Sequence, residues 1–417
     1  MPAPATVTRP GPQDAHATTA LPTATPVRGG LALCVLAIFF YWLSLYLFVP
    51  VLAPQAHRLG AGIGAVGLVL GAYGFVQFLL RIPTGLWSDR IGRRRPFFVA
   101  ALGASAVAAV GMGLAPSPLL LGVFRGISGL GACGWVAISL LFAEFFPPER
   151  TARAFGTIGF LSTASQLIGM FAGGLIAQAA GYGWSFLAAA AFAVLGLLVL
   201  LAVPEPRVGR AGAPAATLTE RLAVGRQRPL LVASGLAIGS TFVTFVTTYG
   251  FVPLLGATRF GAGGAALGVL SVSAGLPAAL SALASGPLGE RLPARAVTLI
   301  GFGVAALGTA ALPLAPSLTA LDAAAAVVGA GLGLIGPTLM TAAVRGYAPQ
   351  LRGSAMGFYQ SIYAIGMFGG PALSGWVGAR LGMGGLFGTT AGFALVGGAL
   401  AWRLLEGRGL AEPAAAS

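Results

Sequence analysis

A short charged stretch at Gly85–Arg95 interrupts an otherwise apolar part of the chain. It reads G-L-W-S-D-R-I-G-R-R-R, which places one carboxylate, Asp89, among four guanidiniums. Only 8% of all residues are charged, so this cluster between two long apolar runs must lie in water. A carboxylate just past a helix end can accept hydrogen bonds from the free N–H groups at the start of a neighbouring helix. We therefore predict an electrostatic contact between helices at Asp89.

Two further ionisable groups lie inside apolar segments. Arg125 is about seven residues into the segment 118–143, roughly 10 Å from its outer end. A charge at that depth must line a cavity, find a partner, or bond to helix carbonyls for packing. Asp322 lies a few residues into the segment 318–343 and is either an early-turn acid or a proton site. We predict Arg125 and Asp322 as candidate ion-coupling residues.

Uncharged polar and aromatic side chains within the apolar segments form a set that could hold a ligand, together with one arginine. The candidates are Tyr46, Tyr73, Gln77, Arg81, Gln166, Thr244, Thr248, Tyr359, Gln360 and Tyr363. The alternative is that these groups join helices by hydrogen bonds. Since no acid lies in the middle of an apolar segment, a dicationic ligand is disfavoured, whereas neutral, zwitterionic or anionic compounds suit Arg81 and Arg125 better.

The composition is that of a protein that crosses a membrane many times. Of 417 residues, 57% are hydrophobic, and the mean hydropathy is +0.88. The net charge of +14 comes from arginines scattered over many loops, so a nucleic-acid partner is not expected. The two cysteines, Cys34 and Cys133, fall inside apolar segments and indicate neither a disulfide framework nor a metal site. We expect no metal and no cofactor.

Twelve windows have the length and apolarity of a membrane-spanning helix. They are about 30–53, 63–86, 96–115, 118–143, 156–180, 183–203, 229–253, 264–287, 296–315, 318–343, 354–378 and 384–404. Strands of a membrane barrel are about ten residues long and alternate, which these windows do not. The predicted class is therefore an all-α membrane protein.

The arginines predict the orientation of these helices. With the N-terminus placed in the cytoplasm, 19 arginines fall on the cytoplasmic side and 3 on the outer side. Such an excess on one side is the positive-inside pattern. We expect a multi-pass protein of the inner (plasma) membrane with both termini in the cytoplasm.

The longest polar connection divides the chain into two similar halves. Shifting the second half by 201 positions aligns it with the first without gaps, and this shift superimposes glycines, charges and helix limits. We predict two parallel six-helix repeats. The predicted units are a disordered cytoplasmic tail at 1–29, a first bundle at 30–203, a linker at 204–228, a second bundle at 229–405 and a tail at 406–417.

The opening stretch resembles the signature loop of the major facilitator superfamily, G-x-x-x-D-R-x-G-R-R. All six specified positions match, namely Gly85, Asp89, Arg90, Gly92, Arg93 and Arg94. The resemblance implies that Asp89 faces the start of the eleventh helix, near 353–354, when the transporter is open to the outside. The arginines could pair with Asp89 or with Glu144. A degenerate second copy keeps Glu290, Arg291 and Arg295, and we expect Glu290 to face residues 155–157.

Two glycine-rich segments also resemble family motifs. Arg125 and the glycines after it are similar to the motif of the fourth helix, whose arginine is proposed in proton-coupled relatives to tune a nearby acid. Drug antiporters carry G-P-x-x-G-G in the fifth helix, where this chain lacks the proline. We expect helix packing at six positions of the fifth and eleventh helices, which are Gly169, Gly173, Gly174, Gly370, Pro371 and Gly375.

The resemblance implies a secondary transporter that moves a small organic solute by alternating access. We predict proton-coupled export, with a metabolite importer, either symporter or uniporter, as the alternative. A non-transporting sensor or scaffold is a weaker hypothesis, because a sensor would be expected to carry a soluble domain. We expect no enzymatic activity, since both histidines lie outside the predicted spans. Membrane lipids are the expected surroundings, and a monomer is the family default.

Overall fold

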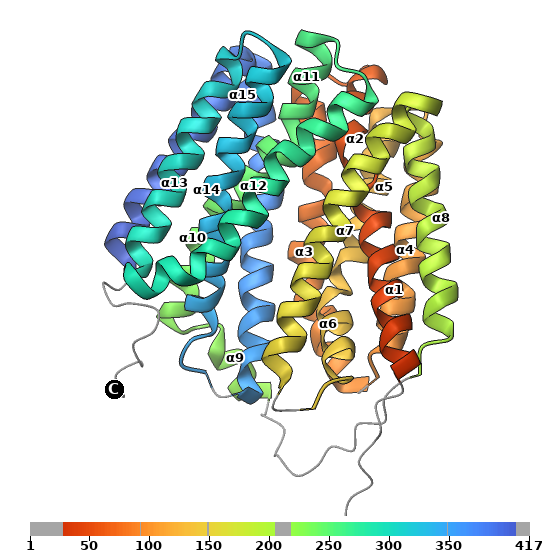
Figure 1. Ribbon diagram of the computed structural model, residues 1–417, viewed down its shortest axis with the longest axis vertical. Helices are drawn as coiled ribbons and strands as arrows, with labels where there is room; N and C mark the ends of the chain where they lie inside the picture. The colour runs from red at the N-terminus through yellow and green to blue at the C-terminus, as the bar shows by residue number, and fades with distance from the viewer. Residues whose placement is uncertain (1–27, 92, 148–149, 205–217, 348, 406–417) are drawn as a thin grey trace, which may run out of the picture.

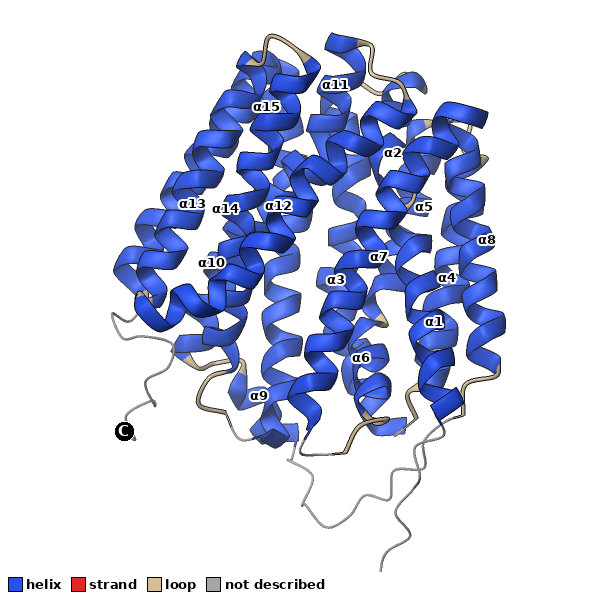
Figure 2. Cartoon of the chain, in the orientation of Figure 1, coloured by secondary structure: helices blue, strands red, loops and turns tan. Residues whose placement is uncertain are grey.

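The computed structural model describes residues 28–91, 93–147, 150–204, 218–347 and 349–405, which are mostly helical (Figures 1 and 2). The first helices are α1 (Arg28–Tyr46), α2 (Val49–Arg58), α3 (Ile63–Ile91), α4 (Arg95–Gly113), α5 (Pro118–Cys133), α6 (Trp135–Ala143), α7 (Thr151–Ala180) and α8 (Tyr182–Leu201). They are followed by α9 (Leu218–Val224), α10 (Arg228–Val246), the π-helical η2 (Thr247–Phe251), α11 (Val252–Phe260), α12 (Gly264–Arg291), α13 (Ala294–Ala311), the 3-10 turn η3 (Leu312–Leu314), α14 (Leu318–Val344) and α15 (Pro349–Leu404). The expected tails 1–27 and 406–417 lie outside the described residues.

The described residues contain eleven helical stretches long and apolar enough to cross a membrane. A bilayer offers no hydrogen-bond partners to the backbone, so each crossing segment must satisfy its own N–H and C=O groups as a helix. The last stretch, residues 351–404, is about 80 Å long as a straight helix, more than twice the hydrocarbon thickness. Gly382 divides it into two helices, because its φ of 68° and ψ of −171° are not helical. Glycine adopts such a positive φ readily, whereas residues with a Cβ rarely do. The all-α class with twelve spans is therefore confirmed.

Several predicted windows have internal breaks or different limits. The window 30–53 consists of α1 and α2 and continues to Arg58, with Pro50 and Pro54 inside α2. Gly134 separates α5 from α6. The window 229–253 continues to Phe260 through the π-helical η2, and α9 lies within the predicted linker. Hydropathy fixes where the chain is apolar, but prolines and packing decide where a helix bends or widens.

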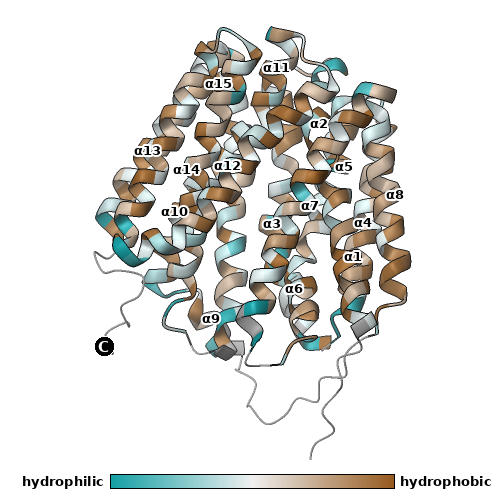
Figure 3. Cartoon of the chain, in the orientation of Figure 1, coloured by the Kyte–Doolittle hydropathy of each residue, from teal (hydrophilic) through white to brown (hydrophobic). Residues whose placement is uncertain are grey.

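The molecule has two ends that differ in their loops. The end named here the Arg90 end, at the bottom of Figure 1, holds α9. The opposite end, named the His57 end, holds the ends of α2 and α11. Figure 3 shows mostly hydrophobic helix surfaces between them, where large side chains such as Leu119 and Leu283 are exposed. This apolar belt suits contact with lipid tails.

Two helix pairs join segments far apart in the sequence. The helix α3 packs along α15, and α7 packs along α12. The other extensive contacts lie among α1, α3, α4, α5, α7 and α8, or among α10, α12, α13, α14 and α15. The division at 204–228 stays a prediction, and the pairs α3–α15 and α7–α12 are called the two seams below.

Close backbone packing at Gly173 generates a stability prediction. A Cβ at this position in α7 would overlap the carbonyl oxygen of Leu47, which belongs to the backbone and cannot rotate away. We expect Gly173→Ala to destabilise the protein by about 1–3 kcal/mol, the usual cost of overpacking. The measurement is the melting temperature of purified protein in detergent.

The matched control is Gly159→Ala in the same helix, where nothing lies within 4 Å of the added methyl group. Since alanine favours helix over glycine by about 1 kcal/mol, this variant should melt at the wild-type temperature or slightly higher. Equal melting temperatures for the two variants would contradict the packing described at Gly173.

Candidate functional site

Both seams are closed toward the His57 end. A Cβ at Gly67 of α3 would meet the Pro371 carbonyl oxygen, and Gly375 lies 3.0 Å from the same point. In the other seam, a Cβ at Gly174 of α7 would lie 2.6 Å from both the Gly264 oxygen and the Gly268 Cα. Side chains are excluded at these points, so the helix backbones touch. No space for a solute remains between the helices there.

The same helices separate toward the Arg90 end. A methyl group added at Gly85 of α3 or at Gly353 of α15 would meet nothing within 4 Å, and the same holds for Gly156 of α7 and Gly286 of α12. Phe155 is also 45% exposed, although it lies on a helix that contacts α12 further along. The two seams are therefore closed at one end and open at the other.

A cavity of about 280 Å³ lies between α7, α10, α12 and α14. Its polar wall comes from α7, α10 and η2, and its opposite wall consists of small residues of α12 and α14. The lining residues are Thr163, Gln166, Leu167, Met170, Ser240, Thr244, Thr248, Tyr249, Ala274, Gly275, Ala278, Ala279, Ala282, Gly329, Leu332, Gly333 and Gly336. Three predicted cavity residues, Gln166, Thr244 and Thr248, are thus brought together, and no acid is among the lining residues.

Three other predicted residues form a stripe on α3. Tyr73, Gln77 and Arg81 are spaced by four residues and so share one helix face. Arg81 donates a 2.8 Å hydrogen bond from Nη1 to Gln77 Oε1. Gln77 Nε2 lies 3.8 Å from the Met367 sulfur of α15, and the Arg81 guanidinium lies 5.8 Å from the Tyr363 ring centre. The side chains of this stripe therefore contact α15 in the α3–α15 seam.

Arg125 of α5 is buried against aromatic rings. Its guanidinium lies 4.2 Å from the Tyr73 ring centre and 5.5 Å from that of Phe48, and Nη1 donates to Ser128 Oγ at 3.3 Å. The side chain is 4% exposed. The face of an aromatic ring partly replaces the water that a guanidinium loses on burial. The structure therefore places Arg125 in a cation–π site rather than beside a carboxylate.

Aromatic rings connect the α3 stripe to the cavity. Phe245 of α10 stacks on Tyr73 at 5.9 Å and meets Tyr249 edge-on at 5.2 Å. Tyr249 lines the cavity and also contacts the Tyr46 ring at 5.4 Å. Tyr249 lies in the π-helical η2, where the wider turn breaks the usual register. Such π-turns are frequent at functional sites.

The predicted residues of α15 lie near the seam with α3. The Tyr359 and Tyr363 rings meet edge-on at 5.3 Å. Thr241 donates a 2.8 Å hydrogen bond to the Tyr363 carbonyl oxygen, which ties α10 to α15. Gln360 is 8% exposed, and its Oε1 has no hydrogen-bond partner among the described residues.

Asp322 of α14 does not line the cavity. Its carboxyl interacts with the Ser273 side chain of α12, while Oδ1 is buried without a hydrogen-bond partner in the part of the chain that the structure describes. The neighbouring Ala274 does line the cavity, so a change at Asp322 could reach it through α12. Asp322 therefore contacts the residue that precedes a cavity-lining alanine, but it does not line the cavity itself.

The signature loop lies at the Arg90 end. Arg90 is exposed, and Arg94 Nη1 donates to Ser88 Oγ at 2.8 Å. Arg93 and Glu144 also have interaction partners. The side chain of Asp89 and all of Gly92 lie outside the described residues. The proposed contact from Asp89 to the start of the eleventh helix therefore stays a prediction.

The second copy of the loop is open in this conformation. Glu290 and Arg291 are exposed, and Arg295 lies 4.6 Å from the ring centre of Trp402. Gly156, on the segment predicted to face Glu290, has open space beside it. In the α14–α15 loop, Arg352 Nε donates to the Tyr347 carbonyl oxygen at 3.1 Å, and burial raises the pKa of the Tyr347 phenol.

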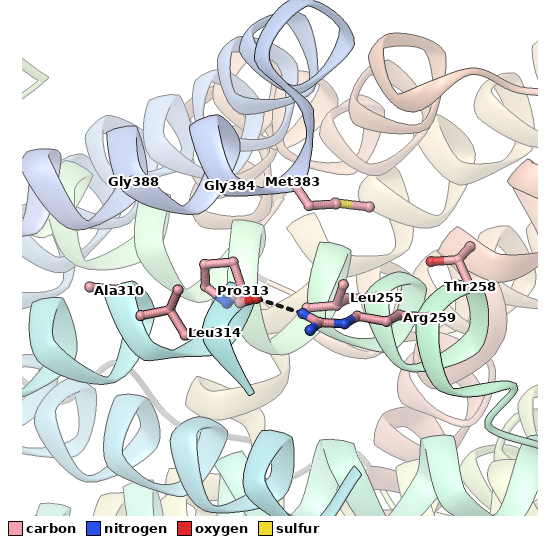
Figure 4. A pocket seen from close by; sticks show the side chains of 9 residues that line it. All are labelled: Leu255, Thr258, Arg259, Ala310, Pro313, Leu314, Met383, Gly384 and Gly388. Carbon is pink, nitrogen blue, oxygen red and sulfur yellow. Dashed lines mark hydrogen bonds between the residues drawn. The ribbon is translucent and has the colours of Figure 1, made fainter. Parts of the chain in front are cut away.

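Two larger hollows lie on the molecular surface. Figure 4 shows one of about 680 Å³ between α11, η3 and α15 at the His57 end, where Arg259 donates to the Pro313 carbonyl oxygen at 2.6 Å. The other, of about 510 Å³, lies between α3 and α5 and is lined by apolar side chains such as Leu68, Leu119 and Val123. These three are exposed on the apolar belt, so this hollow suits a lipid chain rather than a polar solute.

The packing positions predicted in α7 and α15 lie at helix contacts. Gly169 and Gly173 approach α1, and Gly174 approaches α12. Gly370 lies against Phe242 of α10, while Pro371 and Gly375 contact Gly67. The small-residue wall formed by α12 and α14 was not predicted. The 201-residue shift could have indicated this wall, because it aligns the predicted cavity residues Tyr73, Gln77 and Arg81 with three of its alanines.

The helices of this membrane protein enclose a polar cavity, touch one another at one end and separate at the other. This arrangement is typical of a solute transporter. The sequence pattern of the Major Facilitator Superfamily matches residues 34–255 and 237–416. The chain belongs to this superfamily, and it is a secondary transporter rather than an enzyme.

Relatives and solved structures agree with that assignment. Multidrug resistance protein MdtG of Escherichia coli (strain K12 / DH10B) is 25% identical over 397 residues, which cover 92% of this chain and 97% of that protein. A bacterial homolog of the human lysosomal transporter Spinster, crystallised in an inward-facing and unoccupied conformation, has a TM-score of 0.74 at 18% identity and covers 92% of this chain and 97% of its own. The human organic anion transporter MFSD10 (TETRAN) has a TM-score of 0.63 at 20% identity, with 90% and 99% covered. These structures share the fold.

The closed seam at Gly67 generates a conformational prediction. Gly67→Ala adds a methyl group against the Pro371 carbonyl, at a cost of about 1–3 kcal/mol while that end is closed. We expect the ratio of open to closed His57 ends to rise about 5- to 150-fold. The measurement is double electron–electron resonance between spin labels on His57→Cys and Thr258→Cys, with Cys34 and Cys133 replaced by serine. Gly67→Ala should show longer distances between the labels than the protein with Gly67.

Gly369→Ala in α15, the other helix of this seam, is the control, because nothing lies within 4 Å of the added methyl group. It should leave the distance distribution of the labels unchanged. If Gly67→Ala also leaves it unchanged, the seam is not what holds the His57 end closed.

Proposed function

We propose that this transporter exports a small organic compound across the plasma membrane, in exchange for protons. The observation that supports it is a cavity between helices whose backbones touch toward the His57 end and leave open space toward the Arg90 end. The arginine excess of the sequence assigns the Arg90 end to the cytoplasm. In this conformation the cavity therefore takes up its solute from the cytoplasm. Outward release follows when the seams open at the His57 end and close at the Arg90 end.

The similarity to MdtG supports export over import, because that relative is a multidrug resistance protein and the alignment covers 97% of its length. The conformation alone does not separate the two directions, since a cavity open to the cytoplasm also serves an importer releasing its cargo. Import of a metabolite is therefore the second candidate. It is favoured by the absence of an acid among the residues that line the cavity.

Proton exchange requires a group that gains and loses a proton as the transporter turns over. Among the described residues, three acids lie on membrane-spanning helices, which are Asp89 near the end of α3, Glu290 at the exposed end of α12 and Asp322 near the start of α14. Asp322 has a buried, unpartnered Oδ1 and contacts Ser273, which places it on the helix pair α12–α14 that forms one cavity wall. We propose that protonation of Asp322 loosens this contact and biases the cavity toward solute release.

Export is tested by loading energised cells with fluorescent organic compounds and following their release. We expect wild-type cells to release at least one compound faster than empty-vector cells, and a protonophore to abolish the difference. Asp322→Asn should slow the protonophore-sensitive release about tenfold, the effect of 1.4 kcal/mol on the coupled step.

The matched control is Glu220→Gln, which removes an acid from α9 outside the membrane-spanning helices. Its release rate should stay within about twofold of wild type, since exposed surface charges have small effects. Protein-dependent uptake of the same compounds, or release that ignores the protonophore, would reject proton-driven export. Unchanged release by Asp322→Asn would move the coupling site elsewhere.

A further inference from the structure

The two repeats carry opposite chemistry at equivalent positions. The 201-residue shift places Tyr73, Gln77 and Arg81 of α3 at the positions of Ala274, Ala278 and Ala282 of α12. All three alanines line the cavity. The stripe on α3 is thus the counterpart of a cavity-facing stripe, and it carries a phenol, an amide and a guanidinium where the other repeat has only methyl groups.

Arg81 is a buried cation that has no counter-ion among the side chains that the structure describes. It is 5% exposed, and its hydrogen bond goes to the neutral Gln77 side chain. Its Nε is buried with no partner, and no carboxylate of the described residues pairs with it. A buried charge that lacks a partner costs several kcal/mol. A ligand that brings a negative charge removes that cost and supplies the missing acceptors.

The second buried arginine is already accommodated. Arg125 lies over the Tyr73 ring at 4.2 Å and donates to Ser128. The residue that the shift aligns with Arg125 is Ala326, which is not among the residues lining the cavity. Arg81 differs on both counts, because the nearest ring centre is 5.8 Å away and its counterpart Ala282 lines the cavity. Arg81 is therefore the guanidinium placed to meet a solute.

The opposite wall provides room for a hydrocarbon body. Ala278 and Ala282 of α12 face the cavity together with Gly333 and Gly336 of α14, and Leu332 adds an apolar side chain. No ionisable group except the Tyr249 phenol belongs to the lining. An aromatic or alkyl group gains free energy by leaving water for such a recess. Thr244 also lines this cavity, and the rings of Tyr249, Phe245 and Tyr73 connect it to the α3 stripe.

We propose that the solute is an amphiphilic organic anion, whose carboxylate or sulfonate binds Arg81 and Gln77 and whose apolar body fills the cavity against the alanines and glycines of α12 and α14. This inference names the substrate class of the proposed exporter and rests on that function for its direction. A guanidinium holds a carboxylate with two parallel hydrogen bonds, which an ammonium or an amide solute cannot offer. An interior-negative membrane potential also drives an anion outward, by about 2.3 kcal/mol per charge at 100 mV.

The experiment compares three probes that differ only in their polar group. Tritiated 2-naphthylacetate, 2-naphthylacetamide and 2-naphthylethylamine are bound to the purified full-length protein in nanodiscs at neutral pH. We expect the anion to bind at least about tenfold more tightly than the amide and the amine to bind weakest. Arg81→Gln should bring the anion-to-amide ratio close to one, and Arg81→Lys should restore part of it.

Two further variants separate charge recognition from packing. Arg380→Gln removes an exposed arginine whose guanidinium lies over the Trp376 ring of the same helix. This variant should leave all three affinities unchanged. Ala278→Leu fills the recess and should weaken the three probes alike, leaving their ratio intact. Melting temperatures identify any variant that has lost its fold, and in that case the wild-type ranking of the probes still decides.

Wild-type protein that prefers the amine, or an Arg81→Gln ratio equal to that of wild type, overturns the proposal. Binding at equilibrium needs no ion gradient, so its outcome is independent of the transport direction. Anion binding that depends on Arg81, without export from cells, would keep the substrate class and reject the exporter. Export of neutral or cationic compounds only, without anion binding, would do the reverse.

Discussion

Backbone contact between helices at the His57 end determines the conformation of the whole molecule. Gly67 of α3 packs against α15, and Gly174 of α7 packs against α12. At both positions the absence of a side chain lets the two helices approach until main-chain atoms touch. Inside a bilayer, water does not drive helices together, so van der Waals contact of this kind is a main source of their association. Because both seams close at the same end, the helices diverge toward the Arg90 end, and the cavity lies where they begin to separate.

The cost of burying charge explains how the polar groups are distributed. The two buried arginines, Arg81 and Arg125, lie on helices α3 and α5 of the first repeat, while the second repeat has alanines at the equivalent positions. Arg125 is stabilised by aromatic faces and Arg81 by one amide, so their compensation is unequal. Two repeats of similar backbone thus carry different chemistry. A buried guanidinium on α3 and an apolar cavity wall on α12 and α14 together favour a solute with the complementary pattern.

The π-helical turn of α10–α11 and the break at Gly134 lie in helices that surround the central space. Tyr249 on this turn contacts Tyr46 of α1 while lining the cavity, so it joins the first helix to the solute space. Breaks of this kind cost backbone hydrogen bonds and persist where they position a side chain. They also offer points at which a helix can bend as the seams exchange their open and closed ends.

The sequence by itself determined the class of the molecule and much of its chemistry. Long apolar windows in a bilayer can only be helices, so the twelve spans followed from composition, and the loop around Asp89 pointed to the superfamily. The candidate polar residues could also be named, because polar groups in apolar helices are rare. Their roles could not, since a single helix does not reveal which neighbour each face meets.

Only the tertiary structure decided which candidates share a space. It brought Gln166, Thr244 and Thr248 to one cavity, left Asp322 outside it, and placed Arg125 over Tyr73. It also showed that ordinary alanines and glycines of α12 and α14 form a wall. The physical reason is that burial and unpaired charge are properties of packing between helices distant in sequence, whereas hydropathy is a property of each residue alone.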